Sequence, residues 1–540
     1  MIRSICFAFL AFLPFVGCTR TADKAVISPD ATKQTHRGGV LTVAIGQPDG
    51  IDPGSVHEPN GQLVASMMCD QLIMLDPVSG RPRPAIAEGW TVTDNGRKLF
   101  VKIRKNVMFQ NGRQLVADDI GYTLSRVASL EFASLASDLL RNVVGFPFVH
   151  GDLQTRDDHL RQRLSGVKIV DDHSVEIDLD RPFADFYRAL ADPALSPVPH
   201  EEVERDPHAF EAKPVCAGPY KLRSAFTGNT ITLDRFGSYY GKNAAFVSGG
   251  DGYASGVIFE LTSAGGPIPA DVSIAQVVSG QGGPMALTTQ VELLGFPTSL
   301  PPFDEPTVRR AISLAIDREA VASNVYQHKR VPADRFIPAS IESATSRRCA
   351  ADVGAKPNLE QARLLLSKAK VSLSGVKVKF YYNDEFANSQ LMDSIATQLQ
   401  AAFGIEPAMM PMQWEDYLAK GTKGSGFDGV FRYAWSPRYP SADAVIFPLF
   451  HSDSIGRDNL SRFSSRDLDE AILTARKDAD DADRRLDYAR AETIVCDQMP
   501  MTPLVFDRRG FTFSANVDFA RGKPFSSFSA MPNLREAFLK

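Results

Sequence analysis

The pattern of hydrophobic and polar positions predicts a fold that mixes strands and helices from about residue 38 onward. The apolar, β-branched run at residues 40–45 predicts a first strand. Apolar residues at helical spacing over 63–72 predict the helix that follows it. Residues 76–84 are rich in proline and glycine, so they cannot continue that helix and indicate a turn near residue 80.

Two β-hairpins are predicted farther along. The first turns at Asn95-Gly96 between strand-like runs at 90–93 and 99–103, and the second turns at 171–172. Between the hairpins, Asp118 is placed to cap a helix that ends near Val127. Residues 245–302 are rich in Gly, Pro and Ser, so we expect loops and short strands there.

Residues 305–510 alternate helical and strand patterns, which is typical of an α/β domain. Apolar residues between 308 and 316 line one face of a predicted helix, and Asn358 with Gln361 forms a capping box for another. Strands predicted at 376–382 and 427–434 bracket a helix over 389–403 that stops at Gly404. The charged run at 477–485 indicates a solvated connection between helices.

Composition and charge narrow the class of protein. At 540 residues the chain is too long for one hydrophobic core, and 44% hydrophobic with 23% charged residues is typical of soluble, folded proteins. The formal charge of −5 gives no positive field for phosphate backbones, so we expect no nucleic-acid partner.

The first residues predict export. Arg3 precedes an apolar run at 5–16, which is shorter than the roughly 20 residues that span a bilayer, so residues 1–17 are interpreted as a signal peptide. Phe15-Val16-Gly17-Cys18 resembles the lipobox of bacterial lipoproteins, although Phe15 departs from the usual Leu. This predicts a lipidated Cys18, a polar tether over 18–37 and anchoring to a membrane surface. The alternative is an ordinary leader that is cut nearby.

Four cysteines remain besides Cys6 and Cys18. In an exported protein they could form two disulfides, for which three pairings are open, or they could be free buried thiols. They are Cys69, Cys216, Cys349 and Cys496.

The sequence offers little catalytic chemistry. Histidines do not recur at the spacing of helical zinc sites, and neither a Gly-x-Ser-x-Gly elbow nor a phosphate-binding loop occurs. Ser-x-x-Lys occurs at 165–168 and 374–377, but no Lys-Thr-Gly accompanies it. We therefore expect no catalytic residue, metal or cofactor, and a protein that binds rather than reacts.

Several sequence blocks, in order and spacing, resemble the extracellular solute-binding proteins of peptide and nickel ABC importers. They cover the chain from about residue 38 to 510, at 84–90, 94–96, 103–109, 111–112, 117–120, 218–220, 239–241, 308–318 and 362–366.

The resemblance implies an α/β fold of the periplasmic-binding-protein-like type (cluster C), with two main α/β lobes around a cleft and a smaller inserted α+β lobe. The segments it assigns are 38–80, 213–297 and 509–540 for lobe I, 81–212 for the inserted lobe II, and 298–508 for lobe III. Ligand would close the cleft between lobes I and III by a hinge motion.

In peptide-binding members a Trp and, three residues later, an Asp precede Tyr-Pro, and that Asp pairs with the ammonium of the peptide. Here Trp435, Tyr439 and Pro440 match, while the Asp position is Arg438. A guanidinium suits a carboxylate or phosphate, so we predict an anionic group on the ligand at this point. The alternative is that Arg438 pairs with a nearby acid such as Asp443.

Other residues are candidates for the cleft. Trp414 and Tyr433, with Trp435, could supply apolar walls or belong to the core. His57 and Glu58 follow the first strand, where relatives line the cleft, or they are merely exposed.

The implied function is the substrate-binding component of an ABC importer, which captures peptides or peptide-like solutes outside the inner membrane. Its partners would be the permease and ATPase subunits, and the protein is expected to be a monomer in the periplasm or cell envelope. The alternatives are an exported enzyme or a non-transport binding or chaperone protein on the same fold.

Overall fold

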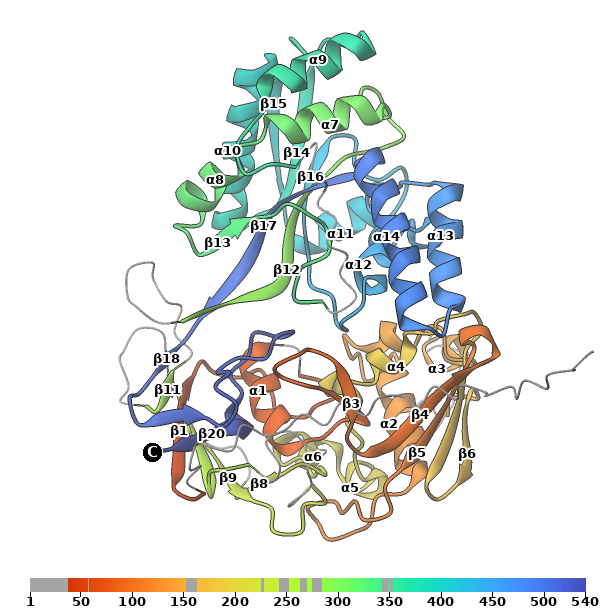
Figure 1. The fold of residues 1–540 in the computed structure, drawn as a ribbon, viewed down its shortest axis with the longest axis vertical. Coiled ribbons are helices and arrows are strands. Elements are labelled where there is room, and N and C mark those ends of the chain that lie inside the picture. The colour runs from red at the N-terminus through yellow and green to blue at the C-terminus, as the bar shows by residue number, and fades with distance from the viewer. Residues whose placement is uncertain are drawn as a thin grey trace, which may run out of the picture. The chain divides into compact units, whose positions relative to one another are not determined.

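Three large sheets organise the residues that the computed structural model describes, which are 37–56, 58–151, 163–224, 228–241, 252–262, 270–273, 284–341, 349 and 353–540. Figure 1 shows how the strands of these sheets are arranged, and each sheet lies against a hydrophobic core of its own. The predicted signal peptide, the lipidation residue Cys18 and all but the last residue of the predicted tether lie outside the described residues, as does His57.

The first sheet has six strands, in the spatial order β18 (Thr512–Phe513), β11 (Val272–Ser273), β1 (Val40–Ile45), β10 (Gly256–Leu261), β9 (Thr230–Arg235) and β8 (Tyr220–Leu222). The predicted first strand is confirmed as β1, which runs parallel to β10 with Val40 opposite Gly256. The predicted helix is confirmed as α1 (Pro59–Met68), and its buried Leu63 and Met67 join this core. The core is completed by the pair β19 (Val517–Phe519) and β20 (Ala537–Leu539).

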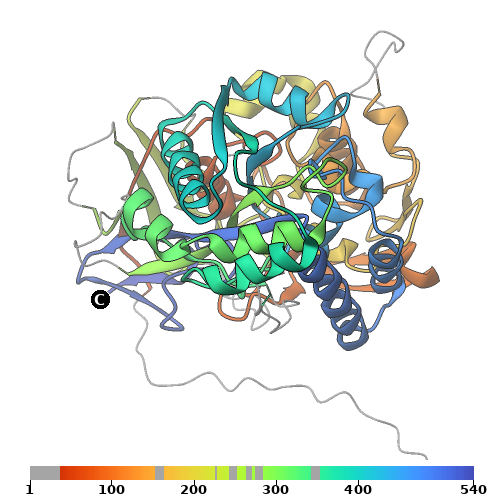
Figure 2. The ribbon, with the colours of Figure 1, turned by 90° about the horizontal axis from the view of Figure 1, so that it is seen from above.

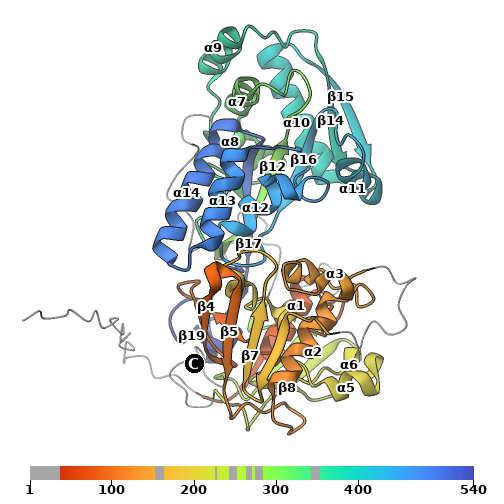
Figure 3. The same ribbon diagram turned by 90° about the vertical axis from the view of Figure 1, so that its right-hand side faces the viewer.

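The second sheet is antiparallel and joins β4 (Ala87–Thr93), β5 (Lys98–Ile103), β7 (Ser174–Asp178) and β6 (Val167–Asp171). Figure 3 shows β4, β5 and β7 side by side. Both predicted hairpins are confirmed, and the first turns through the short 3₁₀ segment η1 (Asp94–Gly96).

The predicted helix after residue 116 is confirmed as α2 (Ala117–Ala128), but its predicted cap is wrong. Val116 is the N-cap residue, and the Asp119 carboxylate accepts a hydrogen bond from the Val116 backbone N–H at 3.0 Å. Asp118 lies instead in the first turn, because the side chain at the third helical position is the one that reaches back to the cap.

Short elements precede, interrupt and follow the strands of the second sheet along the chain. They are β2 (Ile73–Leu75), β3 (Pro82–Pro84), η2 (Ser137–Leu140), α3 (Phe146–Val149), α4 (Phe186–Ala189), η5 (Pro193–Leu195), α5 (His200–Arg205) and α6 (Pro207–Ala212). The turn predicted near residue 80 is confirmed, because β2 and β3 pair across it.

The third sheet has the order β13 (Arg330–Pro332), β17 (Met501–Gly510), β12 (Met285–Gly295), β16 (Val430–Trp435), β14 (Lys377–Asn383) and β15 (Glu406–Met412). Strand β14 runs parallel to β15 and β16, whereas β12 runs antiparallel to both of its neighbours. The strands predicted at 376–382 and 427–434 are confirmed, within a few residues, as β14 and β16.

Helices surround this sheet. They are α7 (Pro306–Ala315), α8 (Arg318–Ala320), α9 (Leu359–Ala369), α10 (Phe386–Phe403), α11 (Trp414–Thr422), α12 (Asp443–Phe450), α13 (Arg466–Lys477) and α14 (Asp481–Gln498), with the short segments η6 (Val321–Val325) and η7 (Ser452–Ser454). The predicted helix boundaries hold at Asn358, whose side chain accepts from the Gln361 N–H at 3.1 Å, and at Gly404, which has a left-handed φ of 72°. The charged run at 477–485 contains the connection between α13 and α14.

The expectation of loops and short strands over 245–302 is wrong for its last part, because β12 has 11 residues. It also lies in the third sheet, although the resemblance assigns its residues to lobe I. With β17 it forms an antiparallel pair through which the chain passes between the first and third sheets (Figures 1 and 2).

Two disulfides settle the pairing that the sequence leaves open. Cys69 bonds to Cys216 and Cys349 bonds to Cys496. The first bond links the end of α1 to the residues before β8, so it closes the segment that contains the whole second sheet.

Candidate functional site

A cavity of about 560 Å³ lies between helix α1 and strands β12 and β17 of the third sheet. One face of α1 contributes Pro59, Gln62, Leu63, Ser66 and Met67, whose spacing puts them on the same side of the helix. The opposite wall comes from β12 at 288–290, from β17 at Asp507 and Arg509, and from residues 436–438 after β16. Residues between 71 and 83 and the segments 191–193 and 526–536 contribute the rest of the lining.

Arg438 lines this cavity, and its partner is Asp192. Its Nε and Nη2 bind the two carboxylate oxygens at 2.9 and 3.1 Å in a fork geometry. Asp192 also accepts from the Ala194 N–H at 2.9 Å, which fixes its position at the start of η5. The partner considered from sequence, Asp443, instead binds Arg476 at 2.8 and 2.7 Å.

The aromatic residues around Arg438 hold the segment that carries it. The Trp435 indole N–H donates to the Ala444 carbonyl at 2.7 Å, and the Tyr439 hydroxyl donates to Asp443 at 2.9 Å. Burial and the neighbouring Asp443 raise the pKa of Tyr439 well above its usual value, so this hydroxyl stays a neutral donor. Neither ring is among the lining residues, so their geometry is that of supports for the Arg438 segment.

The other described residues of the predicted site do not line the cavity. Glu58 caps α1 next to the lining residue Pro59 and accepts from the Asn60 N–H at 2.7 Å. Tyr433 is buried in the third core, where its hydroxyl donates to Asp458 at 3.3 Å, and Trp414 is 46% exposed at the start of α11. Neither Tyr433 nor Trp414 is among the lining residues.

A buried polar cluster beneath the cavity was not predicted. Asp70 receives an ion pair from Arg535 at 2.6 Å and hydrogen bonds from the hydroxyls of Tyr239 and Tyr240 at 2.6 and 2.7 Å. Arg535 and its neighbour Glu536 line the cavity floor. Tyr239 and Tyr240 belong to one of the sequence blocks that carry the family resemblance. Asp70 and Arg535 lie 465 positions apart, so nothing in the sequence connects them.

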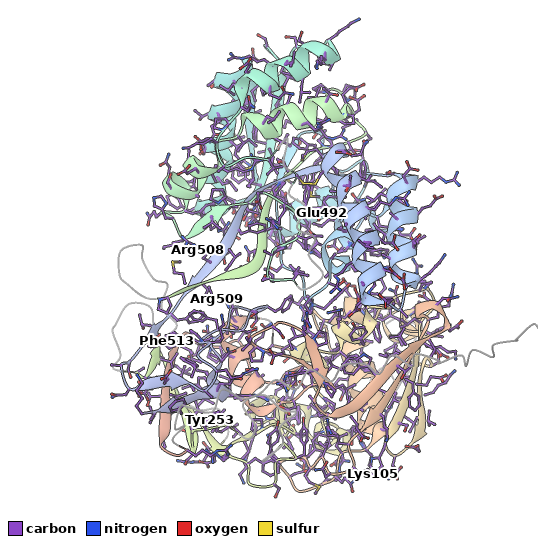
Figure 4. The ribbon with its side chains drawn as sticks, viewed as in Figure 1. Lys105, Tyr253, Glu492, Arg508, Arg509 and Phe513 are labelled. Carbon is purple, nitrogen blue, oxygen red and sulfur yellow. A yellow bond between two sulfur atoms is a disulfide. The ribbon has the colours of Figure 1, made fainter. Side chains whose placement is uncertain are left out.

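The wall made by β12 and β17 is also charged. Glu292 is buried and binds both Arg330, at 2.6 Å, and Arg432, at 3.1 Å. Arg330 further contacts Asp507 at 3.3 Å. Figure 4 shows Arg508 and Arg509 on β17 where it approaches the first sheet.

One group of described residues has the composition of a metal site. Asp119, His200 and Glu201 place ligand atoms within 4.8 Å of one another. Arg113 binds both carboxylates, at 2.5 Å each, so it already supplies the positive charge that a cation would bring. The cluster therefore fits an ion-pair network better than a metal centre.

Comparisons with known proteins agree on one family. The model for the middle region of the bacterial extracellular solute-binding proteins, family 5, matches residues 81–281 and 260–457. The chain is 25% identical to the probable deoxycholate-binding periplasmic protein YgiS of Escherichia coli over 85% of this chain and 86% of that one. It is 24% identical to the periplasmic oligopeptide-binding protein OppA of Salmonella typhimurium over 84% of each chain.

A solved structure has the same fold. The unliganded open form of MppA, a periplasmic murein tripeptide binding protein, superposes with a TM-score of 0.76 at 19% identity, over 93% of this chain and 97% of that one. In the described part of the chain, none of the helices combines the length and the apolar character that crossing a bilayer requires.

Proposed function

Because the chain belongs to the bacterial extracellular solute-binding proteins of family 5, we propose that it is the substrate-binding component of an ABC importer. The observation that carries the proposal is the cavity of about 560 Å³, whose lining comes from elements on both sides of the β12–β17 pair. Closure about two connecting strands is the hinge motion by which such receptors enclose a solute.

The proposed solute is a peptide or a peptide-like molecule. Oligopeptide and murein tripeptide appear in the names of OppA and MppA, and the cavity wall offers Thr288, Thr289, Gln290 and Ser436 as hydrogen-bonding groups for amides. The name of YgiS points to deoxycholate, so family membership alone does not fix the chemical class.

The charge at Arg438 argues for a ligand without a free ammonium at that point. Arg438 is held on one side by Asp192, and it stands at the position where peptide-binding members of the family have the Asp that pairs with an ammonium. We propose that Arg438, with Trp435 and Tyr439 behind it, forms the part of the wall that meets an anionic or blocked end of the ligand. Trp414, Tyr433, His57 and Glu58 remain proposed contributors to the closed site.

The proposed lobes follow the segments that the resemblance implies, with lobe II between residues 81 and 212, except that β12 belongs with lobe III because it lies in the third sheet. The second sheet and its core lie mostly within that range, which supports the assignment. A lipid anchor at Cys18 would hold the protein at a membrane surface, where the permease and ATPase subunits act, and a monomer would suffice for delivery. A solute receptor needs no catalytic residue, which sets this function apart from an exported enzyme.

The test identifies the ligand directly. The chain with Cys18→Ser, purified without refolding and then denatured, is expected to release a peptide or peptide-like compound that mass spectrometry identifies. The matched control is the same protein unfolded, dialysed and refolded, which should release nothing. Released peptides with a free, unblocked amino terminus and no acidic group would contradict the role of Arg438 while leaving the receptor function intact.

A further inference from the structure

The charged side chains of the cavity are nearly all neutralised by the protein itself. Four ion pairs account for most of them, Arg438 with Asp192 at 2.9 Å, Arg535 with Asp70 at 2.6 Å, Glu536 with Arg521 at 2.7 Å and Asp507 with Arg330 at 3.3 Å. Arg83 lies in the electrostatic field of Asp70 and Asp76. A ligand therefore meets paired charges over most of the wall.

Arg509 differs from this pattern. It lines the cavity and is half-buried, and its Nη1 donates a hydrogen bond to the sulfur of Met531 at 2.7 Å. Among the residues that the structure describes, it has no carboxylate within 4.0 Å. Burial lowers the pKa of Arg509, and the more distant Asp507 and Glu58 compensate for this only in part.

The alternation of side chains along β17 directs Arg509 into the cavity. Asp507 and Arg509 are two positions apart and both line it, as residues on one face of a strand do. Arg508 is not a lining residue, and it donates to the His328 carbonyl. Figure 4 labels both arginines on this strand.

The surface around Arg509 is apolar and adaptable. Met531 touches it directly, and Met67, Met74, Phe528 and Leu534 line the same cavity. Methionine side chains repack at low cost around ligands of different shapes. Among the described residues, the site therefore combines the guanidinium of Arg509 with a wall that accepts apolar groups of different shapes.

We infer that Arg509 is the residue that selects a carboxylate-bearing solute, binding the carboxylate with its guanidinium while the ligand's apolar part packs against the methionines. This inference rests on the proposed receptor function and assigns the anionic subsite to Arg509, on β17, in addition to the Arg438 segment. A half-buried guanidinium without a carboxylate gains a charge-assisted hydrogen bond when the ligand brings one.

The experiment measures binding of two matched probe pairs by calorimetry. One pair is the tripeptide N-acetyl-Ala-Phe-Leu and its C-terminal amide, and the other is deoxycholate and its uncharged methyl ester. The proteins are the mature chain with Cys18→Ser and that chain with Arg509→Gln, Arg509→Lys or Arg508→Gln. Thermal unfolding of each variant confirms that it is folded.

Within the probe pair that the wild type binds, we expect its affinity for the carboxylate to exceed its affinity for the uncharged partner by about 10- to 100-fold. Arg509→Gln should reduce this ratio to near one, Arg509→Lys should restore part of it, and Arg508→Gln should leave it unchanged because that side chain faces away. Equal affinity of the wild type for acid and neutral probe overturns the inference, and so does an unchanged ratio in Arg509→Gln.

The outcomes also separate this inference from the proposed function. Binding of the deoxycholate pair alone, with the expected ratio, supports the role of Arg509 and contradicts a peptide ligand. Equal affinity for the tripeptide acid and its amide supports the receptor function and contradicts the role of Arg509. If the wild type binds neither N-acetyl-Ala-Phe-Leu nor deoxycholate, both the proposed function and the role of Arg509 are overturned.

Discussion

At the scale of single residues, Asp443 is the most densely bonded carboxylate near the site. It is fully buried and accepts hydrogen bonds from Arg476, from Tyr439 at 2.9 Å and from Tyr488 at 2.8 Å. Burial alone would raise its pKa, but the charge and hydrogen bonds of Arg476 and the two tyrosines hold the pKa of Asp443 below its usual value. The cluster ties α12 to α13 and α14 behind the Arg438 segment.

Asp443→Asn is expected to lower the free energy of unfolding by about 3–5 kcal/mol at pH 7, because it leaves Arg476 buried without a counter-charge. A carboxylate whose pKa is lowered in the folded state stabilises the fold above its unfolded pKa of about 3.9 and loses this contribution as the pH falls through the folded value. Urea unfolding between pH 7 and pH 3 measures both effects.

The variant should therefore approach the wild type in stability as the pH falls below about 4. The control is the double change Asp443→Leu with Arg476→Met, which removes both charges and should cost less than Asp443→Asn. A double variant that is less stable than Asp443→Asn would contradict the ion-pair explanation.

The partner of Arg438 and the role of Arg509 were not predicted from the sequence. The motif around Trp435 contains Arg438, which lines the cavity, but it suggests the nearby acid Asp443 as the alternative partner. The observed partner, Asp192, is 246 positions away, and such a distance leaves no periodic or compositional trace. Arg509 was missed for a similar reason, because it differs from other arginines on strands only in that most of the charged residues around it are already paired.

At the scale of elements, the β4–β5 hairpin was predicted from Asn95-Gly96, and its packing was not. Gly96 has a left-handed φ of 79°, and an added Cβ would lie 2.6 Å from the Arg476 carbonyl oxygen and 2.9 Å from the Ala184 backbone nitrogen. The turn thus presses on the end of α13, and Ala184 donates its N–H to the same carbonyl at 2.8 Å. This contact joins the second sheet to the helices of the third.

Gly96→Ala is expected to lower the free energy of unfolding by about 2–4 kcal/mol, since the new methyl group meets rigid backbone in addition to the unfavourable φ. Gly112→Ala is the matched control, because Gly112 has a similar φ of 91° and no atom within 4 Å of the added Cβ. It should cost only about 1–2 kcal/mol. Equal losses for the two variants, measured by urea unfolding, would contradict the close approach.

Strand β12 marks the limit of prediction for elements. Its centre is Thr288, Thr289 and Gln290, which are polar because they line the cavity, and it follows a stretch rich in glycine. The sequence therefore lacks the apolar alternation that identified β1, β5 and β14. Strands β1, β5 and β14 were predicted within a few residues, whereas β12, whose polar centre lines the cavity, was not.

At the scale of the whole molecule, each of the two disulfides crosslinks segments that lie far apart in the sequence. Each joins residues 147 positions apart, Cys69 with Cys216 around the second sheet and Cys349 with Cys496 beside the third. Bonds that close long loops restrict the unfolded chain most strongly. The sequence could count the cysteines but could not choose among three pairings, because pairing depends on which segments the fold brings together.

Replacing Cys69 and Cys216 together by Ser is expected to lower the free energy of unfolding by about 2–5 kcal/mol, as loss of a long-loop disulfide does. Urea unfolding of this variant with and without dithiothreitol measures the loss, and the variant with both Cys349 and Cys496 replaced is the counterpart for the other bond. Peptide mapping without reduction should recover Cys69 linked to Cys216. A Cys69–Cys349 or Cys69–Cys496 peptide would contradict the pairing.

The position of Arg509 on β17 has a mechanical consequence for the receptor proposed above. Points near a rotation axis travel least, so a charge carried by one of the two connecting strands keeps nearly the same place before and after closure. An anchor at the pivot holds its ligand with similar strength in both states and cannot by itself favour either. The free energy that favours closure must come from residues far from the axis, at the entrance of the cavity. Arg509, near the axis, instead determines which ligands remain bound long enough to be enclosed.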